Sequence, residues 1–451
     1  MTDIAMRSIL LAVLVLTAAA PAQALPRSMS LGLMDAAFTE APDPWLARAA
    51  ATCADVVRVT TSWVGIAPTR PQDPTDPADP AYRWASTDRA VDYVRAAGLT
   101  PILSLTGAPA WATGAGRPAG VEPAAWRPDA SAYGQFAVAL ARRYAGRVRT
   151  YLPWNEPNLA KYLAPQWVRR GGRWRTEAPR TYRALVNAFT DGVRSVDRRA
   201  RVVAGATAPF GDPSPGTTKR IAPARFVRDW LAGRTRFDVL SLHPYSTRGP
   251  LAPALNDDDV SVPDLRKLVA PLRAAERAGR ITPRGTRPVW VTEMSWDSSP
   301  PDPNGVPAAT HARWVAQALR ELWRQGVATV VWFQIRDQAH EPSYGATSQS
   351  GLFLRDGTPK PAAAAFALPL VADAVRGGRA NVWVRVPAAG TLVLERRRAG
   401  RTATVARLRV RAGQVVQRRV AARGGDSLRA RVGERTSRAW RLERVRTRLD
   451  E

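Results

Sequence analysis

The chain has 451 residues, 66 basic against 38 acidic ones, a formal charge of +28 and a single cysteine, Cys53. One cysteine excludes an intrachain disulfide and a thiolate metal site, and the three histidines show no metal-ligand spacing. The basic residues are scattered and only four are lysines, which indicates a general preference for arginine. We therefore expect no nucleic-acid partner, while an anionic cell-wall polymer stays open as a partner.

The N-terminus predicts an export signal over residues 1–24. Arg7 precedes an apolar run from Ile9 to Ala20, and Ala22-Gln-Ala24 offers small residues for cleavage. This run is short for a membrane span, and no later segment is long enough for one. We expect a secreted or cell-envelope protein without stable membrane insertion; a retained N-terminal anchor is the alternative.

From Ser30 to about Leu370 the sequence alternates between strand-like and helix-like runs. In residues 133–144, for example, apolar side chains recur at a helical period, and Thr310 is a candidate N-cap for the helix before the last strand. Eight strand candidates begin near Leu31, Val56, Thr100, Val148, Arg201, Phe237, Pro288 and Val327. This pattern predicts an α/β fold, a (β/α)8 TIM barrel over residues 28–375. A doubly wound sheet would also alternate, but no glycine-rich phosphate loop follows the first strand.

The connections between these elements differ in length. Those that enter strands are short, whereas those that leave strands are long and rich in Pro, Asp and Gly, as in Thr69–Tyr82, Pro209–Pro223 and Ser298–Pro307. The long loops therefore gather at the C-terminal face, where barrel active sites lie.

Past Gly378 the pattern changes to short alternating runs such as Asn381–Pro387 and Thr402–Val410. They predict a small antiparallel, sandwich-like β domain over residues 378–451. A packing module and a glycan- or wall-binding module are both compatible with its arginine-rich composition.

Two glutamates in apolar, aromatic surroundings are the candidate catalytic residues. Glu156 lies in Tyr151-Leu-Pro-Trp-Asn-Glu-Pro-Asn158, and Glu293 lies in Val289-Trp-Val-Thr-Glu-Met-Ser-Trp296. Each follows a β-rich run, so each is expected at a strand tip. The fourth and seventh strands lie nearly across the mouth of a barrel, so both carboxylates can face one cleft. Paired acids of this kind suit hydrolysis of a glycosidic bond, and about 5 to 5.5 Å between them suits a retaining mechanism.

The Trp154–Asn158 and Trp290–Trp296 stretches resemble the acid/base and nucleophile motifs of clan A glycoside hydrolases. The first is most similar to family 39, and family 5 cellulase-like enzymes come next. The resemblance implies retaining enzymes on a (β/α)8 barrel that need no metal or organic cofactor, with Glu156 as acid/base and Glu293 as nucleophile. It also implies five substrate-binding or supporting positions: Asn155 on a sugar hydroxyl, His243 and Tyr245 near the nucleophile, Trp332 as the floor of the sugar subsite, and Arg58 beside the nucleophile.

The substrate stays open at the level of sequence. The resemblance favours a β-linked glycan or glycoside, but the basic segment from Gln166 to Arg180 matches no known subsite. One alternative is a catalytically silent barrel that binds envelope polysaccharide, although such a protein has no need of two paired acids. Another is a basic envelope protein that binds nucleic acid, which would show steep salt dependence.

Overall fold

The computed structural model describes residues 25–40, 42–212 and 219–444, so the export signal predicted for residues 1–24 lies outside the described residues. Within those ranges, the helices are all too short or too polar to cross a membrane.

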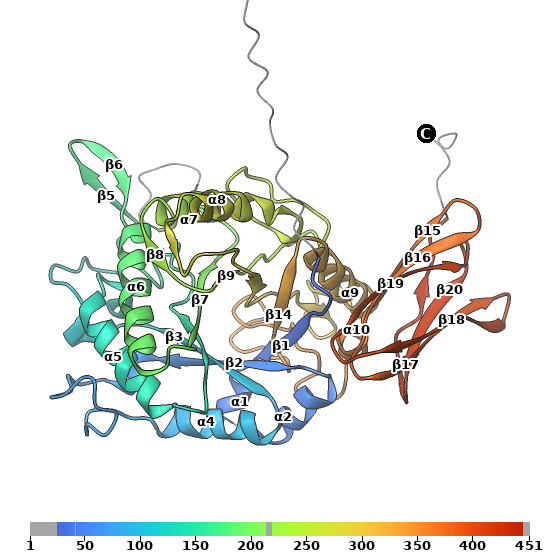
Figure 1. Cartoon of the computed structure of the whole chain (residues 1–451), viewed down its shortest axis with the longest axis horizontal. Coiled ribbons are helices and arrows are strands. Elements are labelled where there is room, and N and C mark those ends of the chain that lie inside the picture. Colours follow the sequence, from blue (N-terminus) through green and yellow to red (C-terminus); the bar gives the residue numbers. More distant parts are fainter. Residues whose placement is uncertain (1–24, 41, 213–218, 445–451) are drawn as a thin grey trace, which may run out of the picture.

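Eight parallel strands close into a barrel, which confirms the predicted fold (Figure 1). Around the ring they follow the order β1-β14-β11-β9-β7-β4-β3-β2. Their bounds are β1 Ser30–Met34, β2 Val56–Ser62, β3 Thr100–Thr106, β4 Thr150–Pro153, β7 Arg201–Thr207, β9 Val239–Leu242, β11 Val289–Val291 and β14 Val327–Phe333.

Helices surround the barrel and bury their apolar stripes against it (Figure 1). In α5, Tyr133, Phe136 and Leu140 are fully buried, and Asp129 caps the N-terminus. The candidate cap Thr310 is wrong, because α9 begins two residues earlier and Pro307 holds its N-cap position. The helices are α1 Ala37–Glu40, α2 Pro42–Ala51, α3 Trp63–Ile66, α4 Ala85–Ala96, α5 Ala130–Arg143, α6 Ala178–Val196, α7 Pro223–Trp230, α8 Arg266–Arg277, α9 Ala308–Arg324 and α10 Pro361–Ala367.

Short strands decorate the barrel. The basic segment after β4 forms a hairpin that projects from the body of the barrel, and Trp174 on it is exposed (Figure 1). The short strands are β5 Trp167–Arg170, β6 Arg173–Thr176, β8 Thr235–Arg236, β10 Ile281–Thr282, β12 Ser298–Ser299 and β13 Val306–Pro307.

The C-terminal part forms two antiparallel sheets, β15-β16-β19 and β18-β17-β20-β21, with β22 paired to β20. Their bounds are β15 Leu370–Val375, β16 Arg379–Arg385, β17 Gly390–Arg398, β18 Arg401–Val410, β19 Val415–Ala421, β20 Ser427–Val432, β21 Arg435–Thr436 and β22 Trp440–Arg441. The sequence assigned 370–375 to the barrel domain, but β15 pairs along its whole length with β16. The sheet of the β domain therefore begins at Leu370 rather than at 378.

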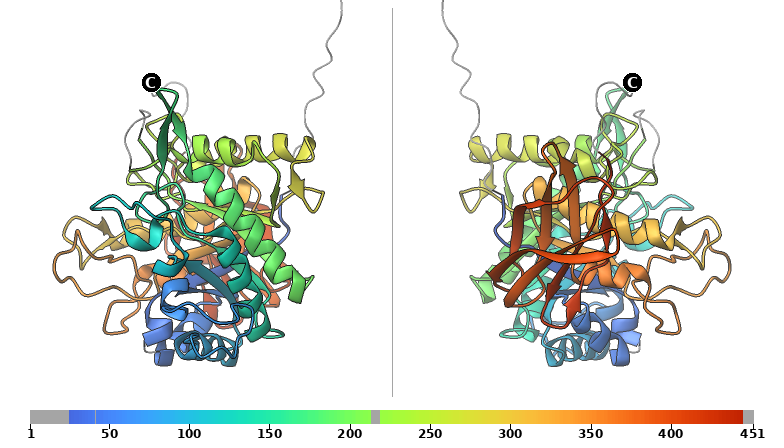
Figure 2. Two further views of the ribbon diagram at one scale, coloured as in Figure 1. Left: turned by 90° about the vertical axis from the view of Figure 1, so that its left-hand side faces the viewer. Right: turned by 90° about the vertical axis from the view of Figure 1, so that its right-hand side faces the viewer.

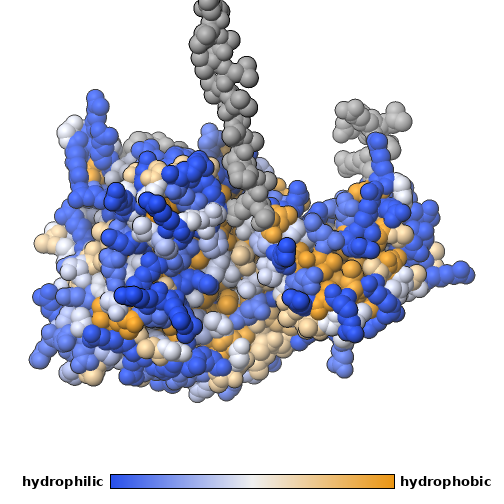
Figure 3. All heavy atoms as spheres, in the orientation of Figure 1, coloured by the Kyte–Doolittle hydropathy of each residue, from blue (hydrophilic) through white to orange (hydrophobic). Residues whose placement is uncertain are grey.

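The β domain packs against one side of the barrel (Figure 1), and the right-hand view of Figure 2 looks onto its outer face. The fully buried Arg385 crosses between them: its guanidinium binds the Asp55 carboxylate at 2.7 Å and the Met29 carbonyl at 3.1 Å. Trp323 of α9 packs on Trp383 of β16. In Figure 3 hydrophilic residues cover most of the visible face, and hydrophobic ones gather where the β domain meets the barrel.

Candidate active site

The C-terminal tip of β4 holds Glu156 in a strained backbone. Trp154 and Glu156 both adopt positive φ, at 74° and 38°, a conformation that costs energy for residues with a Cβ. Two hydrogen bonds hold this turn: the Trp154 indole donates to the Tyr162 carbonyl at 2.8 Å, and the Glu156 amide donates to the Ala206 carbonyl of β7 at 3.0 Å. The strain is the kind that proteins keep at functional sites.

Glu293 follows β11 and faces the same space as Glu156. One oxygen of each carboxylate and one nitrogen of His243 all lie within 4.8 Å of one another. The Glu156 and Glu293 side chains keep 13% and 16% of their surface exposed. The barrel thus brings the two predicted glutamates together, and both remain open to solvent.

The two carboxylates have different surroundings. Burial raises the pKa of Glu156 to about 7, and the nearby cations Arg58 and Lys161 oppose this only in part. Glu293 instead forms a 2.8 Å salt bridge with Arg58 and accepts a 2.9 Å hydrogen bond from the Tyr245 hydroxyl. Near neutral pH the site can therefore hold one protonated acid beside one carboxylate that is stabilised by a cation.

His243 connects the pair. Burial lowers its pKa to about 3, so the ring is neutral at physiological pH. Arg58 Nη1 lies 3.4 Å from Nε2, and because a guanidinium can only donate, Nε2 is the acceptor and Nδ1 carries the proton. Nδ1 is 3.0 Å from Glu156 Oε1. His243 therefore donates to Oε1 and leaves Oε2 of Glu156 free for a proton of its own.

Arg58 organises the site from β2. Besides Glu293 it binds Asn155 Oδ1 at 2.6 Å and the Thr292 carbonyl at 3.0 Å, and its side chain is almost fully buried. A single guanidinium thus fixes the nucleophile candidate and the asparagine beside Glu156, using the fork of donors that only arginine offers.

Trp332 does not lie where the resemblance implied. Its side chain has no exposed surface; the indole donates to the Ser350 carbonyl at 2.9 Å and packs on His311 of α9 and on Trp296. The ring faces the surrounding helix and has no face open to a sugar. Because neighbouring strand residues point to opposite sides, the partly exposed Phe333 occupies the inward position at the end of β14.

Two residues near the carboxylates were not predicted. The Thr292 hydroxyl lies 3.1 Å from His243 Nε2. Burial, together with the charges of both glutamates, raises the pKa of Tyr162 to about 12, although Arg58 and the Asn155 side chain oppose that rise. The position of Thr292 directly before Glu293 could have indicated its role, whereas Tyr162 lies in a loop and carries no such signal.

The pair of carboxylates is poorly suited to a metal ion and lies beside a cavity. Glu156, His243 and Glu293 could each offer a ligand atom, but the Arg58 guanidinium already bound to Glu293 would repel a cation. A cavity of about 480 Å³ lies beside Tyr245 and is also lined by Trp296 and Asn304. Because Tyr245 also donates to Glu293, the cavity lies next to the pair of carboxylates.

The chain matches no model of a known protein family and no curated protein. Among solved structures it is similar to a family 39 glycoside hydrolase from Bacteroides cellulosilyticus WH2, with a TM-score of 0.55 and 17% identity over 88% of this chain and 81% of that one. A family 39 beta-xylosidase from Caulobacter crescentus gives a TM-score of 0.48 and 16% identity over 88% of this chain and 97% of that one. A family 30 endoxylanase from Clostridium papyrosolvens C71 gives a TM-score of 0.49 and 14% identity over 88% of this chain and 95% of that one. The first similarity establishes a shared barrel fold.

Proposed function

We propose that this protein is a retaining glycoside hydrolase that cleaves a β-linked glycan or glycoside by double displacement. The observation that carries the proposal is the approach of the two carboxylates, since one oxygen of Glu156 lies within 4.8 Å of one oxygen of Glu293. Inverting enzymes hold their acids about 6.5 to 9.5 Å apart to admit a water, whereas retaining ones need about 5 to 5.5 Å.

In the first step Glu156 acts as the acid. Its Oε2 proton passes to the glycosidic oxygen as the bond to the anomeric carbon breaks, while the His243 contact at 3.0 Å holds Oε1. A Glu293 oxygen attacks the anomeric carbon from the opposite face and forms a glycosyl ester. The Arg58 salt bridge and the Tyr245 hydrogen bond orient Glu293 for that attack.

In the second step the roles reverse. The ester removes the negative charge of Glu293, so the pKa of Glu156 falls and its carboxylate can take a proton from water. The hydroxide equivalent attacks the anomeric carbon, the ester bond to Glu293 breaks, and the sugar leaves with its original configuration.

The remaining polar groups would bind the sugar. Arg58 engages the Oδ1 of Asn155, so the amide NH₂ is the end left to meet the hydroxyl next to the anomeric carbon. This contact would strengthen in the transition state. Given the export signal expected at residues 1–24, we propose that the reaction takes place outside the cytoplasm, at the envelope or in the medium.

The test is trapping of the glycosyl-enzyme. Wild-type protein, incubated with a panel of activated 2-deoxy-2-fluoro glycosides, should gain the mass of one sugar on the peptide that contains Glu293. Glu293→Gln should lose turnover by several orders of magnitude, and Glu156→Ala should regain part of it with azide. Exposed Glu434→Gln is the matched control and should behave as wild type. Glycan binding without turnover or adduct on any glycoside would favour the silent polysaccharide-binding barrel instead.

A further inference from the structure

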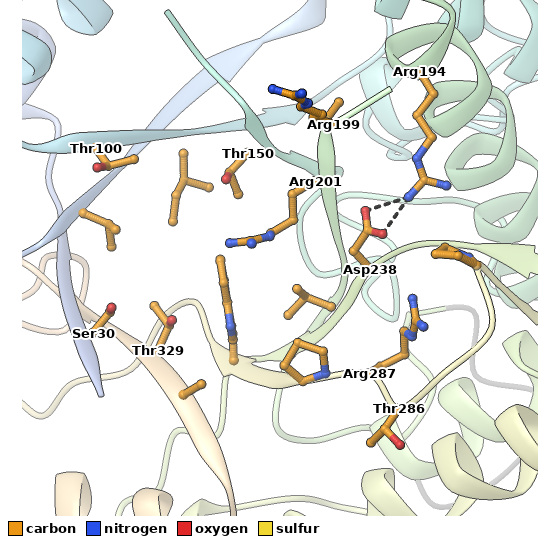
Figure 4. Close-up of a pocket in the computed structure, with 18 of the residues that line it drawn as sticks. Ser30, Thr100, Thr150, Arg194, Arg199, Arg201, Asp238, Thr286, Arg287 and Thr329 are labelled. Atoms are coloured by element: carbon orange, nitrogen blue, oxygen red, sulfur yellow. Dashed lines mark hydrogen bonds and ion pairs between the residues drawn. The ribbon is translucent and has the colours of Figure 1, made fainter. Parts of the chain in front are cut away.

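The opposite end of the barrel contains a second cavity. Its volume is about 920 Å³, and it is lined by residues at the N-terminal ends of the barrel strands (Figure 4). Ser30, Thr100 and Thr150 are the first residues of β1, β3 and β4, and Thr329 is the third of β14. Glu156 and Glu293 lie past the other ends of their strands, so this cavity is separate from the candidate active site.

The wall of the cavity carries excess positive charge. Five arginines and one acidic residue, Asp238, line it: Arg194, Arg198, Arg199, Arg201 and Arg287. Arg194 binds both oxygens of Asp238, at 2.7 and 2.8 Å, and so uses the one available carboxylate (Figure 4). The buried Arg287 donates to backbone carbonyls, which carry no charge.

The other three arginines have no carboxylate partner. Arg198, Arg199 and Arg201 form no ion pair or side-chain hydrogen bond within the described ranges, and all three are exposed. The Arg201 side chain extends into the middle of the cavity, and its guanidinium lies 5.7 Å from the centre of the Trp290 ring (Figure 4). Because Trp290 is itself buried in the barrel interior, the stacking fixes where this cation stands. Its donors remain available to a ligand.

Hydroxyl groups complete the lining. Thr150 and Thr329 are 8% and 4% exposed, and neither hydroxyl has a hydrogen-bond partner among the described residues. Both threonines line the cavity, so their hydroxyls can donate to a ligand that occupies it. Cations on one side and free donors on the other match the oxygens of an oxyanion.

We propose that this cavity binds a ligand with two or more oxyanion groups, phosphate or carboxylate, held by Arg199, Arg201 and the threonine hydroxyls. Like charges that face one space repel, and an anion between them relieves that repulsion. The volume is large enough for an acidic disaccharide or a diphosphate group. Neither Glu156 nor Glu293 lines this cavity, so binding of such a ligand does not depend on the proposed hydrolase function.

Calorimetric titration of the full chain at low salt tests the proposal with two probes. Pyrophosphate offers phosphate without a sugar, and tri-galacturonate offers carboxylates on a glycan. Wild type should bind at least one, with a stoichiometry of one. Arg199→Gln/Arg201→Gln should weaken the binding about tenfold or more, because charge-assisted hydrogen bonds are lost. Thr150→Val/Thr329→Val should weaken it while the charge is unchanged.

Arg89→Gln/Arg95→Gln on α4 is the matched control, since both arginines are exposed, form no ion pair in the described ranges and lie outside the cavity. It should bind as wild type does. The preferred probe identifies the source of the oxyanions as phosphate or acidic glycan. An equal loss of binding affinity in the cavity variant and the control variant would show that the overall positive charge attracts the probe, and it would overturn the proposal. Failure of wild type to bind either probe would overturn it as well.

Discussion

Replacing Glu156 with glutamine should stabilise the protein at alkaline pH while it removes the acid. The carboxyl is held where burial opposes ionisation, with the buried neutral His243 against one oxygen. Glutamine has nearly the same shape and can keep the contact with Nδ1 through its carbonyl oxygen. It cannot ionise, so it never has to place a charge in that position.

The raised pKa of Glu156 sets how much stability the protein loses when this carboxyl ionises. Raising a carboxyl pKa from 4.5 to about 7 corresponds to about 3 kcal/mol of stability. Below pH 4.5 the group is protonated in both the folded and the unfolded chain, so the wild type has its full stability. Between pH 4.5 and 7 the unfolded chain releases the proton while the folded chain keeps it, and stability is lost. Above pH 7 the loss is complete.

Urea unfolding followed by tryptophan fluorescence at pH 4 and pH 8 measures this effect. The free energy of unfolding of Glu156→Gln, relative to wild type, should rise by about 3 kcal/mol from pH 4 to pH 8. The exposed Glu434→Gln should show no such rise. A difference that does not depend on pH would refute the argument that burial perturbs Glu156. The same ionisation should make the hydrolysis rate of wild type fall as the pH rises through about 7.

Three further substitutions test individual contacts. Arg58→Gln removes the cation beside Glu293 and should lower kcat about 10²- to 10³-fold without unfolding the chain, by steady-state kinetics and circular dichroism; an unchanged kcat would contradict its role. Lys360→Met leaves the buried Asp337 without its 2.6 Å partner and should destabilise the chain by about 3 to 5 kcal/mol in urea, whereas a neutral effect would show that the pair contributes nothing. Trp332→Phe should lower stability and leave KM unchanged, because the ring faces away from the site; a raised KM would restore it as a sugar platform.

The barrel and its two acids could be predicted from sequence because both signals are local. Each barrel strand is a short apolar run, and each glutamate lies two or three residues past the end of one, so the sequence shows the strand end and the carboxylate together. The closed ring then brings the tips of β4 and β11 to one mouth. Those steps need only the order of elements along the chain.

Features that depend on packing could not be predicted in this way. The phase of side-chain alternation at the end of β14 decides whether Trp332 or Phe333 faces inward, and the sequence Val-Trp-Phe is apolar on both sides. The strand β15 forms by pairing with β16, a contact that its own sequence does not show. It also begins soon after the alanine-rich helix α10. The basic cavity likewise joins residues around 194–201 with Arg287, which only the closed barrel brings together.

The anomeric configuration of the first product tests the central claim most directly. Proton NMR of a hydrolysis reaction, recorded before mutarotation, distinguishes the two outcomes on any β-glycoside that the protein cleaves. Carboxylates as close as those of Glu156 and Glu293 predict a β-configured product. An α-configured first product would mean that a water fits between the two acids, and it would contradict the mechanism built on their separation.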